Sequence, residues 1–161
     1  MEERINEKVT EIAQSVHKTI PVAWENLFIN ITLTFDGGEV YYFFNEEGKS
    51  DYIYNLYIPK QYGVSNSEFR ENERRTFKLA WELREIFKND EQALWTTCVI
   101  KIIGTKLIST FDYAPWYESG FTSGQQMDYF EYKYLGKQPA NEKELEQFKA
   151  MEAFQREHSS N

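Results

Sequence analysis

The sequence predicts an α+β fold in which helices pack against a single antiparallel sheet. Helical periodicity marks the start, the middle and the end of the chain, and alternating strand patterns lie between these segments. Short polar turns join successive strands, which favours antiparallel neighbours over parallel ones. The expected order is α-β-β-β-α-β-β-α(α), a three-stranded meander plus a hairpin.

The first half supplies one helix and the meander. A helix is expected over residues 2–19, where an apolar stripe recurs every three or four positions before Pro21 blocks continuation. Strands are expected at 27–35, 39–45 and 51–58, with Pro59 ending the last. The first strand predicts one buried face and one wetter face. Its proposed buried face carries Ile29, Ile31, Leu33 and Phe35.

The second half supplies the remaining elements. After a loop at 61–67, Ser65 with Glu68 resembles a capping box that starts a helix reaching residue 88. A hairpin is expected from 95–103 and 106–113, followed by a short helix at 125–135 and a helix at 142–155 capped by Asn141. No linker or repeat divides the chain, so we expect one domain over 1–155 and a frayed tail over 156–161.

Composition favours a cytoplasmic protein with a basic partner. The chain has 161 residues, a net charge of −8 and one cysteine, with no signal-peptide pattern and no apolar run long enough to span a membrane. Acidic surfaces repel nucleic acid phosphates and anionic lipid, so direct binding to either is disfavoured. The charge alone is equally consistent with a requirement for solubility.

Nothing in the sequence assembles a catalytic or metal site. His17 lies beside the apolar stripe of the first helix, His158 lies in the tail, and Cys98 lies in an apolar strand. No metal-ligand motif and no phosphate-binding glycine loop is present. We therefore predict no catalytic residue, no metal and no cofactor. Acids such as Asp36 and Glu39 beside a turn are more typical of solvated turn residues than of ligands.

Residues 111–136 hold nine aromatic residues with acids threaded between them. Nucleic-acid stacking platforms place aromatics in a basic groove, which this segment lacks. Phe111, Phe130 and Tyr134 are expected in the core. The irregular loop at 112–121 is expected to present Trp116, Tyr117 and Glu118 outward, because Tyr and Trp are enriched at interface hot spots.

Several stretches together resemble the YezG-like family of bacterial immunity proteins. They are IPVAWE at 20–25, GEVYYFF at 38–44, WELREIF at 81–87 and YKYLG at 132–136, in an order that spans roughly residues 5–139. The resemblance implies a cytoplasmic antitoxin without enzymatic activity. Its expected partner is the toxic C-terminal domain of an exported polymorphic toxin, which in the best-known cases is a nuclease exported by type VII secretion.

Stoichiometric binding to a basic toxin domain is therefore the leading hypothesis. The candidate toxin-binding residues, chosen by residue type, are Asp36, Glu39, Asp112, Tyr113, Trp116, Tyr117, Glu118, Phe121 and Asp128. Two alternatives remain open: a metal-dependent hydrolase that uses clustered carboxylates, and a chaperone-like adaptor for an exported protein. The sequence leaves the oligomeric state undetermined.

Overall fold

The computed structural model describes residues 1–158, and the chain divides after Phe111 into two compact units. Unit 1, Met1–Phe111, contains the sheet and two long helices. Unit 2 begins at Asp112 and contains two further helices. The expectation of a single domain over 1–155 stays a prediction, and each unit is described by itself.

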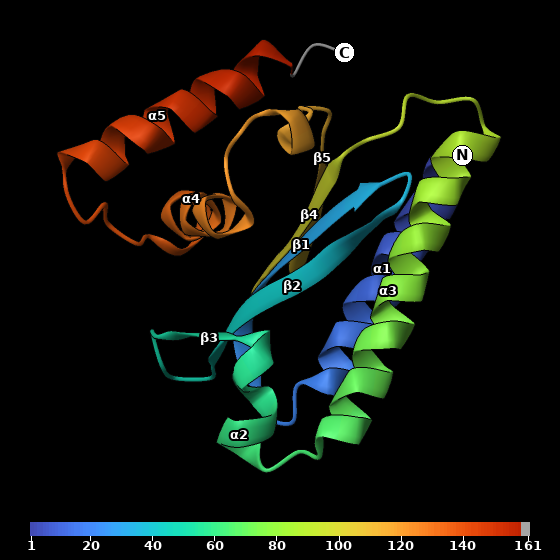
Figure 1. The fold of residues 1–161 in the computed structure, drawn as a ribbon. Helices are drawn as coiled ribbons and strands as arrows, with labels where there is room; N and C mark the ends of the chain where they lie inside the picture. The colour runs from blue at the N-terminus through green and yellow to red at the C-terminus, as the bar shows by residue number, and fades with distance from the viewer. Residues whose placement is uncertain (159–161) are drawn as a thin grey trace. The chain divides into compact units, whose positions relative to one another are not determined.

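Unit 1 is built on one five-stranded sheet of order β3-β2-β1-β4-β5 (Figure 1). The strands are β1 (Trp24–Thr34), β2 (Gly37–Glu46), β3 (Tyr52–Tyr54), β4 (Thr97–Ile103) and β5 (Lys106–Asp112). Strand β1 is central and pairs antiparallel with β2 and β4, so Ile29 faces both Tyr42 and Ile100. The predicted α+β class, meander and hairpin are confirmed.

Two helices lie side by side along one face of this sheet (Figure 1). They are α1 (Glu2–Thr19) and α3 (Asn66–Asn89), and they run antiparallel, because ion pairs join Arg4 to Asp90 and Lys8 to Glu82. Between them, the hydroxyls of Ser15 and Thr76 are buried and lie 2.7 Å apart. Their apolar stripes hold Val9, Ile12, Val16, Ala80, Leu83 and Phe87, all buried as the periodicity requires.

The expectation of a wetter second sheet face is wrong for the middle of β1, where Phe28 and Asn30 are buried at 5% and 6% exposure. It holds towards the end of the strand, where Thr32 and Thr34 are half-buried. On this face the Phe28 ring meets Tyr52 edge-on at 5.7 Å, and Phe43 stacks on Tyr54 at 5.3 Å. Aromatic pairs across neighbouring strands add stability beyond the area that they bury, so both sides of β1 carry apolar packing.

Phe35 corrects the same prediction in the opposite sense. The alternation places it on the buried face, yet its side chain is 86% exposed. The reason is that β1 ends at Thr34, so Phe35 belongs to the turn and leaves the strand's alternation.

The third strand is much shorter than residues 51–58. It is followed by a 3-10 turn, η1 (Asn55–Tyr57), and by α2 (Ile58–Tyr62), in which Pro59 occupies the first turn. The Asn55 side chain explains the change, because its Oδ1 accepts a hydrogen bond from the Tyr42 backbone at 3.3 Å. This side chain replaces a strand partner, and the main chain turns away from the sheet. Proline is compatible with a first helical turn, where no backbone donor is needed.

Unit 2 contains η2 (Trp116–Glu118), α4 (Ser123–Leu135) and α5 (Glu142–Glu157). The Asn141 cap is confirmed by a 2.9 Å hydrogen bond from the Glu144 backbone, as the Ser65 cap of α3 is by one from Glu68. A capping box at Thr122, with Gln125, was not expected. Helix α5 includes the first two residues of the predicted tail, and residues 159–161 lie outside the described part.

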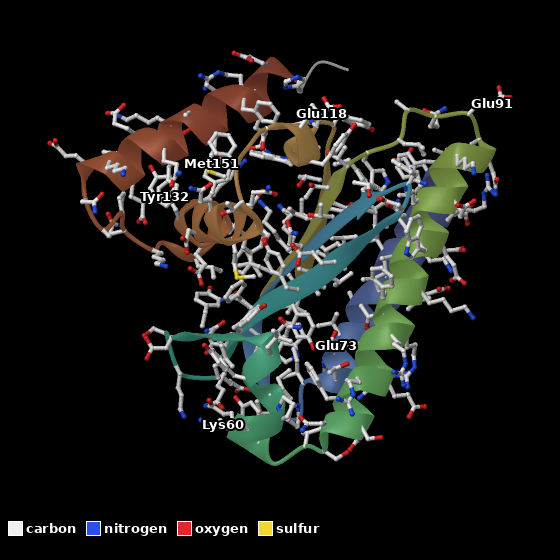
Figure 2. The ribbon with its side chains drawn as sticks, in the orientation of Figure 1. Lys60, Glu73, Glu91, Glu118, Tyr132 and Met151 are labelled. Atoms are coloured by element: carbon white, nitrogen blue, oxygen red, sulfur yellow. The ribbon has the colours of Figure 1, made fainter. Side chains whose placement is uncertain are left out.

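The core of unit 2 lies between its two helices. Its fully buried members are Ala114, Trp116, Tyr129, Phe148 and Met151. Phe121, Tyr132 and Phe154 pack against this cluster, and the Tyr132 ring stacks on Phe148 at 4.6 Å. Figure 2 shows Tyr132 on α4 and Met151 on α5 turned towards each other. Phe130 is buried as expected, whereas Phe111 and Tyr134 are half-buried.

A partly buried carboxylate ties α3 to the strands of unit 1 (Figure 2). Glu73 Oε1 accepts hydrogen bonds from Asn55 Nδ2 at 3.0 Å and from the Tyr42 hydroxyl at 3.2 Å. Burial raises the pKa of the Glu73 carboxyl above its ordinary value, and the two hydrogen bonds oppose this rise only in part.

This geometry predicts that Glu73→Gln stabilises unit 1 at pH 7. A carboxyl with a raised pKa binds its proton more tightly when folded, so its contribution to the free energy of unfolding falls as pH rises through that pKa. Glutamine stays neutral and keeps an oxygen for Asn55 and Tyr42. Urea unfolding from pH 4 to pH 8 should show the variant's advantage growing with pH. Glu71→Gln, at an exposed position on the same helix, should show no such trend. A pH-independent difference at Glu73 would contradict the assignment.

Candidate functional site

The nine candidate toxin-binding residues belong to both units. Asp36 and Glu39 lie at the β1–β2 hairpin of unit 1. The other seven lie in unit 2, six of them on the segment between β5 and α4 or at its edge. Each unit therefore carries its own group of candidates, and each group is described by itself.

Asp112 organises the start of unit 2. Its carboxylate accepts hydrogen bonds from the Ala114 backbone at 2.9 Å, from Trp116 Nε1 at 2.8 Å and from Gln155 Nε2 at 3.0 Å. One half-buried side chain thus fixes the loop, orients the indole and holds helix α5. Such charge-assisted hydrogen bonds are the stronger kind in proteins.

The expectation that Trp116 points outward is wrong. The side chain is only 7% exposed, and its ring lies 5.1 Å from Phe154 and 6.2 Å from Tyr129. The indole buries its ring in the unit 2 core because Asp112 satisfies the only polar group that burial would otherwise leave without a partner. Sequence spacing carries no signal for this inward rotation.

The next two residues do face outward. Tyr117 is 65% exposed, and Glu118 is exposed at the end of η2 (Figure 2). The turn beneath them is held by hydrogen bonds from Ser119 Oγ to the Trp116 carbonyl at 2.6 Å and from the Phe121 backbone to Ser119 Oγ at 3.1 Å. An aromatic ring and a carboxylate are therefore presented on a pre-organised turn.

The remaining candidates of unit 2 are less available. Tyr113 and Phe121 are half-buried, and Phe121 packs against Trp116 at 6.3 Å. Asp128, on α4, lies 3.5 Å from Lys137 Nζ, so part of its charge is neutralised. On this segment Glu118, next to Tyr117, is the carboxylate that is both exposed and without an ion pair among the described residues.

The hairpin of unit 1 is constrained in its own way. The Thr34 hydroxyl lies 2.7 Å from Asp36 Oδ1 and 3.1 Å from the Gly37 carbonyl, so it bridges the turn. Gly37 has a φ of 146°, and a Cβ at Gly38 would come within 2.0 Å of the Thr32 carbonyl. Asp36 and Glu39 are exposed beside Phe35. Sequence reasoning did not name Phe35 as a candidate. The Asp-Gly-Gly turn sequence that directly follows Phe35 could have indicated that the strand ends before it.

Groups with potential chemistry occupy structural positions. Cys98 is fully buried, and burial raises the pKa of its thiol, which disfavours the nucleophilic thiolate. His17 Nδ1 accepts a hydrogen bond from Trp24 Nε1 at 3.1 Å. Among residues 1–158, the His, Cys, Asp and Glu side chains form no group of three that could hold a metal ion. No helix in that range has the length and hydropathy of a membrane span.

The role of Asp112 predicts a loss of stability on Asp112→Asn. The amide nitrogen would face at least one of the three donors now bound, so the variant should lose about 1–3 kcal/mol of unfolding free energy. Asp128→Asn is the matched control, because an exposed ion pair contributes at most about 1 kcal/mol. Chemical unfolding followed by Trp fluorescence measures both. Equal stability of Asp112→Asn and the unsubstituted protein would contradict the network.

Comparison with known proteins places the chain among immunity proteins. The model of the family described as "Immunity protein YezG-like" matches residues 5–149. "Type VII secretion system protein EsaG" of Staphylococcus aureus is 31% identical over 157 residues, which cover 97% of this chain and 96% of that protein. "Immunity protein YezG" of Bacillus spizizenii is 29% identical over 80% of each chain, and its namesake in Bacillus subtilis is 24% identical over 84% and 90%. The protein therefore belongs to the YezG-like family of immunity proteins.

Proposed function

We propose that this protein neutralises the toxic C-terminal domain of a cognate exported toxin by binding it one to one in the cytoplasm of the producing cell. The observation that carries the proposal is the family match over residues 5–149. The names of the relatives support it, since two are immunity proteins and one is a type VII secretion system protein.

The charge of the chain favours a nuclease as the toxic domain. A nuclease holds its substrate through basic side chains that contact phosphates. This chain has a net charge of −8, and exposed carboxylates lie in both groups of candidates, at Asp36, Glu39 and Glu118. Opposite charges accelerate association by electrostatic steering, which benefits a protein that must capture a toxin before it acts.

Within unit 2 we propose that Tyr117 and Glu118 contact the toxin. Tyr117 supplies an aromatic anchor of low conformational entropy, and Glu118 supplies a charge that can pair with Lys or Arg. Tyr113 and Phe121 flank them, whereas Asp112 and Trp116 support the turn from beneath. Mutations of the last two therefore mix folding with recognition, which makes Glu118 the sharper position to test.

The stoichiometry of inhibition tests the proposed function. The partner to use is the C-terminal domain of the cognate toxin, purified and assayed on DNA. A binding inhibitor should abolish nuclease activity at about one equivalent and co-elute with the domain at a one-to-one mass. Inhibition by far less than one equivalent would contradict the proposal in favour of turnover, and a lack of both inhibition and co-elution would overturn it.

A charge reversal tests the unit 2 surface separately. Glu118→Lys should weaken binding to that domain by about tenfold or more, which corresponds to about 1.4 kcal/mol. Glu146→Lys makes the same charge change at an exposed position on α5 and should change affinity by less than about threefold, because exposed, distant charges are screened. If both variants weakened binding equally, the loss would reflect the net charge of the protein and not a contact made by Glu118.

A further inference from the structure

Phe35 is the most exposed large hydrophobic side chain that the structure describes in unit 1, at 86%. Met1 is 40% exposed and Leu94 is 37% exposed, and the three come from three separate segments. Scattered exposed hydrophobic residues need no explanation, whereas a group of them at one place often marks an interaction site.

Two contacts bring these three segments to the same end of the sheet. The Arg4–Asp90 ion pair joins the start of α1 to the end of α3. The Leu33 backbone donates to the Thr96 carbonyl at 3.0 Å, which continues the β1–β4 register beyond Thr32 and Thr97. The start of α1, the β1–β2 turn and the loop that carries Leu94 therefore share one end. Figure 2 shows Glu91 at this end and Lys60 at the opposite one.

We call this end the acidic tip. It comprises the three apolar residues and the exposed acids around them, namely Glu2, Glu3, Asp36, Glu39 and Glu91. Arg4 is paired with Asp90, and Lys88 is a further exposed cation at this end, so the five exposed carboxylates are offset only in part. The tip thus combines apolar anchors with a surplus of carboxylates.

Phe35 lies outside the buried core that stabilises unit 1. The turn is set by the Thr34 hydroxyl bridge and by the two glycines. An aromatic ring held out on a constrained turn costs little entropy when it is bound, which is the property of a hot-spot residue.

We infer that the acidic tip is a docking surface for a basic protein domain, with Phe35 inserted into an apolar pocket and the surrounding carboxylates paired with Lys and Arg. The inference rests on the proposed function, which makes that domain the toxic domain of the cognate toxin. Charge complementarity selects this occupant. A second copy of the same tip would be repelled, because its carboxylates would face their own kind.

The opposite end of unit 1 provides the controls. It also exposes hydrophobic side chains, namely Leu56, Tyr57, Ile103 and Leu107 at 58%, 59%, 52% and 37%, so exposed apolar residues alone do not distinguish the two ends. Its charges are mixed, since Lys49 pairs with Glu46 and Lys60 is exposed nearby. Tyr57→Ala therefore removes an exposed ring at the opposite end, one that also packs against Tyr54, and Glu47→Lys makes the same charge change as Glu39→Lys at another exposed position.

Binding kinetics of these four variants with the toxic domain test the inference. The partner is an inactivated form of the toxic C-terminal domain of the cognate toxin, and rates are measured in about 50 and 200 mM salt. Phe35→Ala should weaken affinity about thirtyfold, mainly through faster dissociation. Glu39→Lys should slow association and reduce its salt dependence. The two controls should stay within about threefold of the unsubstituted protein.

The outcomes distinguish a failure of the inferred docking surface from a failure of the proposed function. If the unsubstituted protein inhibits the domain but the tip variants bind as it does, the acidic tip is not the docking surface and the function stands. If Tyr57→Ala weakens binding as much as Phe35→Ala, the location is likewise overturned. If the unsubstituted protein neither binds nor inhibits, the proposed function fails and the inference fails with it. Thermal unfolding of Phe35→Ala, and recovery of affinity in Phe35→Leu, exclude an effect on folding.

Discussion

The burial of the central strand β1 is the constraint on which unit 1 depends. Leu27 to Ile31 are all buried, so the strand needs apolar packing on both of its faces and partners along both of its edges. One face meets the stripes of α1 and α3, and the other carries the rings of Phe28, Phe43 and Tyr54. The strand leads into the turn that carries Phe35, and the Thr34 hydroxyl bridges that turn. If Phe35 docks as we infer, a turn constrained in this way has little freedom to lose on binding.

Local patterns predicted the elements whose stability is local. The helix at 2–19 was fixed by its apolar stripe, and the caps at Ser65 and Asn141 were fixed by side chains three residues from the groups that they satisfy. The hairpin around Gly104 followed from turn chemistry. In each case the sequence pattern that predicts the element lies within a few residues of the groups that interact to form it.

The errors arise where a tertiary contact overrides a local pattern. The third strand ends early because Asn55 bonds to Tyr42 and Glu73, which lie 13 and 18 residues away. Trp116 turns inward because its indole N–H donates a hydrogen bond to Asp112 and its ring packs in an aromatic cluster. Phe35 leaves the buried face because the strand stops one residue before it. Consequently sequence reasoning placed Phe35 inward and Trp116 outward, whereas the structure shows the reverse, and the candidate site itself stays a prediction.

Inhibition by one-to-one binding, as proposed, needs a surface and no reacting group. In that proposal the acidic side chains on the turns of both units meet the requirement, and Phe35 in one unit and Tyr117 in the other are the aromatic anchors. Each turn is held from beneath by its own polar network, through Thr34 in unit 1 and through Asp112 and Ser119 in unit 2. Affinity for a basic partner then depends on shape and charge that exist before the encounter.

Hydrogen–deuterium exchange of the protein, alone and bound to the toxic domain, tests the central claim most directly. The account predicts slower exchange on binding at residues 34–40 of the hairpin and at 116–120 of the η2 turn, with little change at 55–60. Protection confined to 55–60, or to segments that carry no acidic candidate, would contradict recognition through the acidic turns.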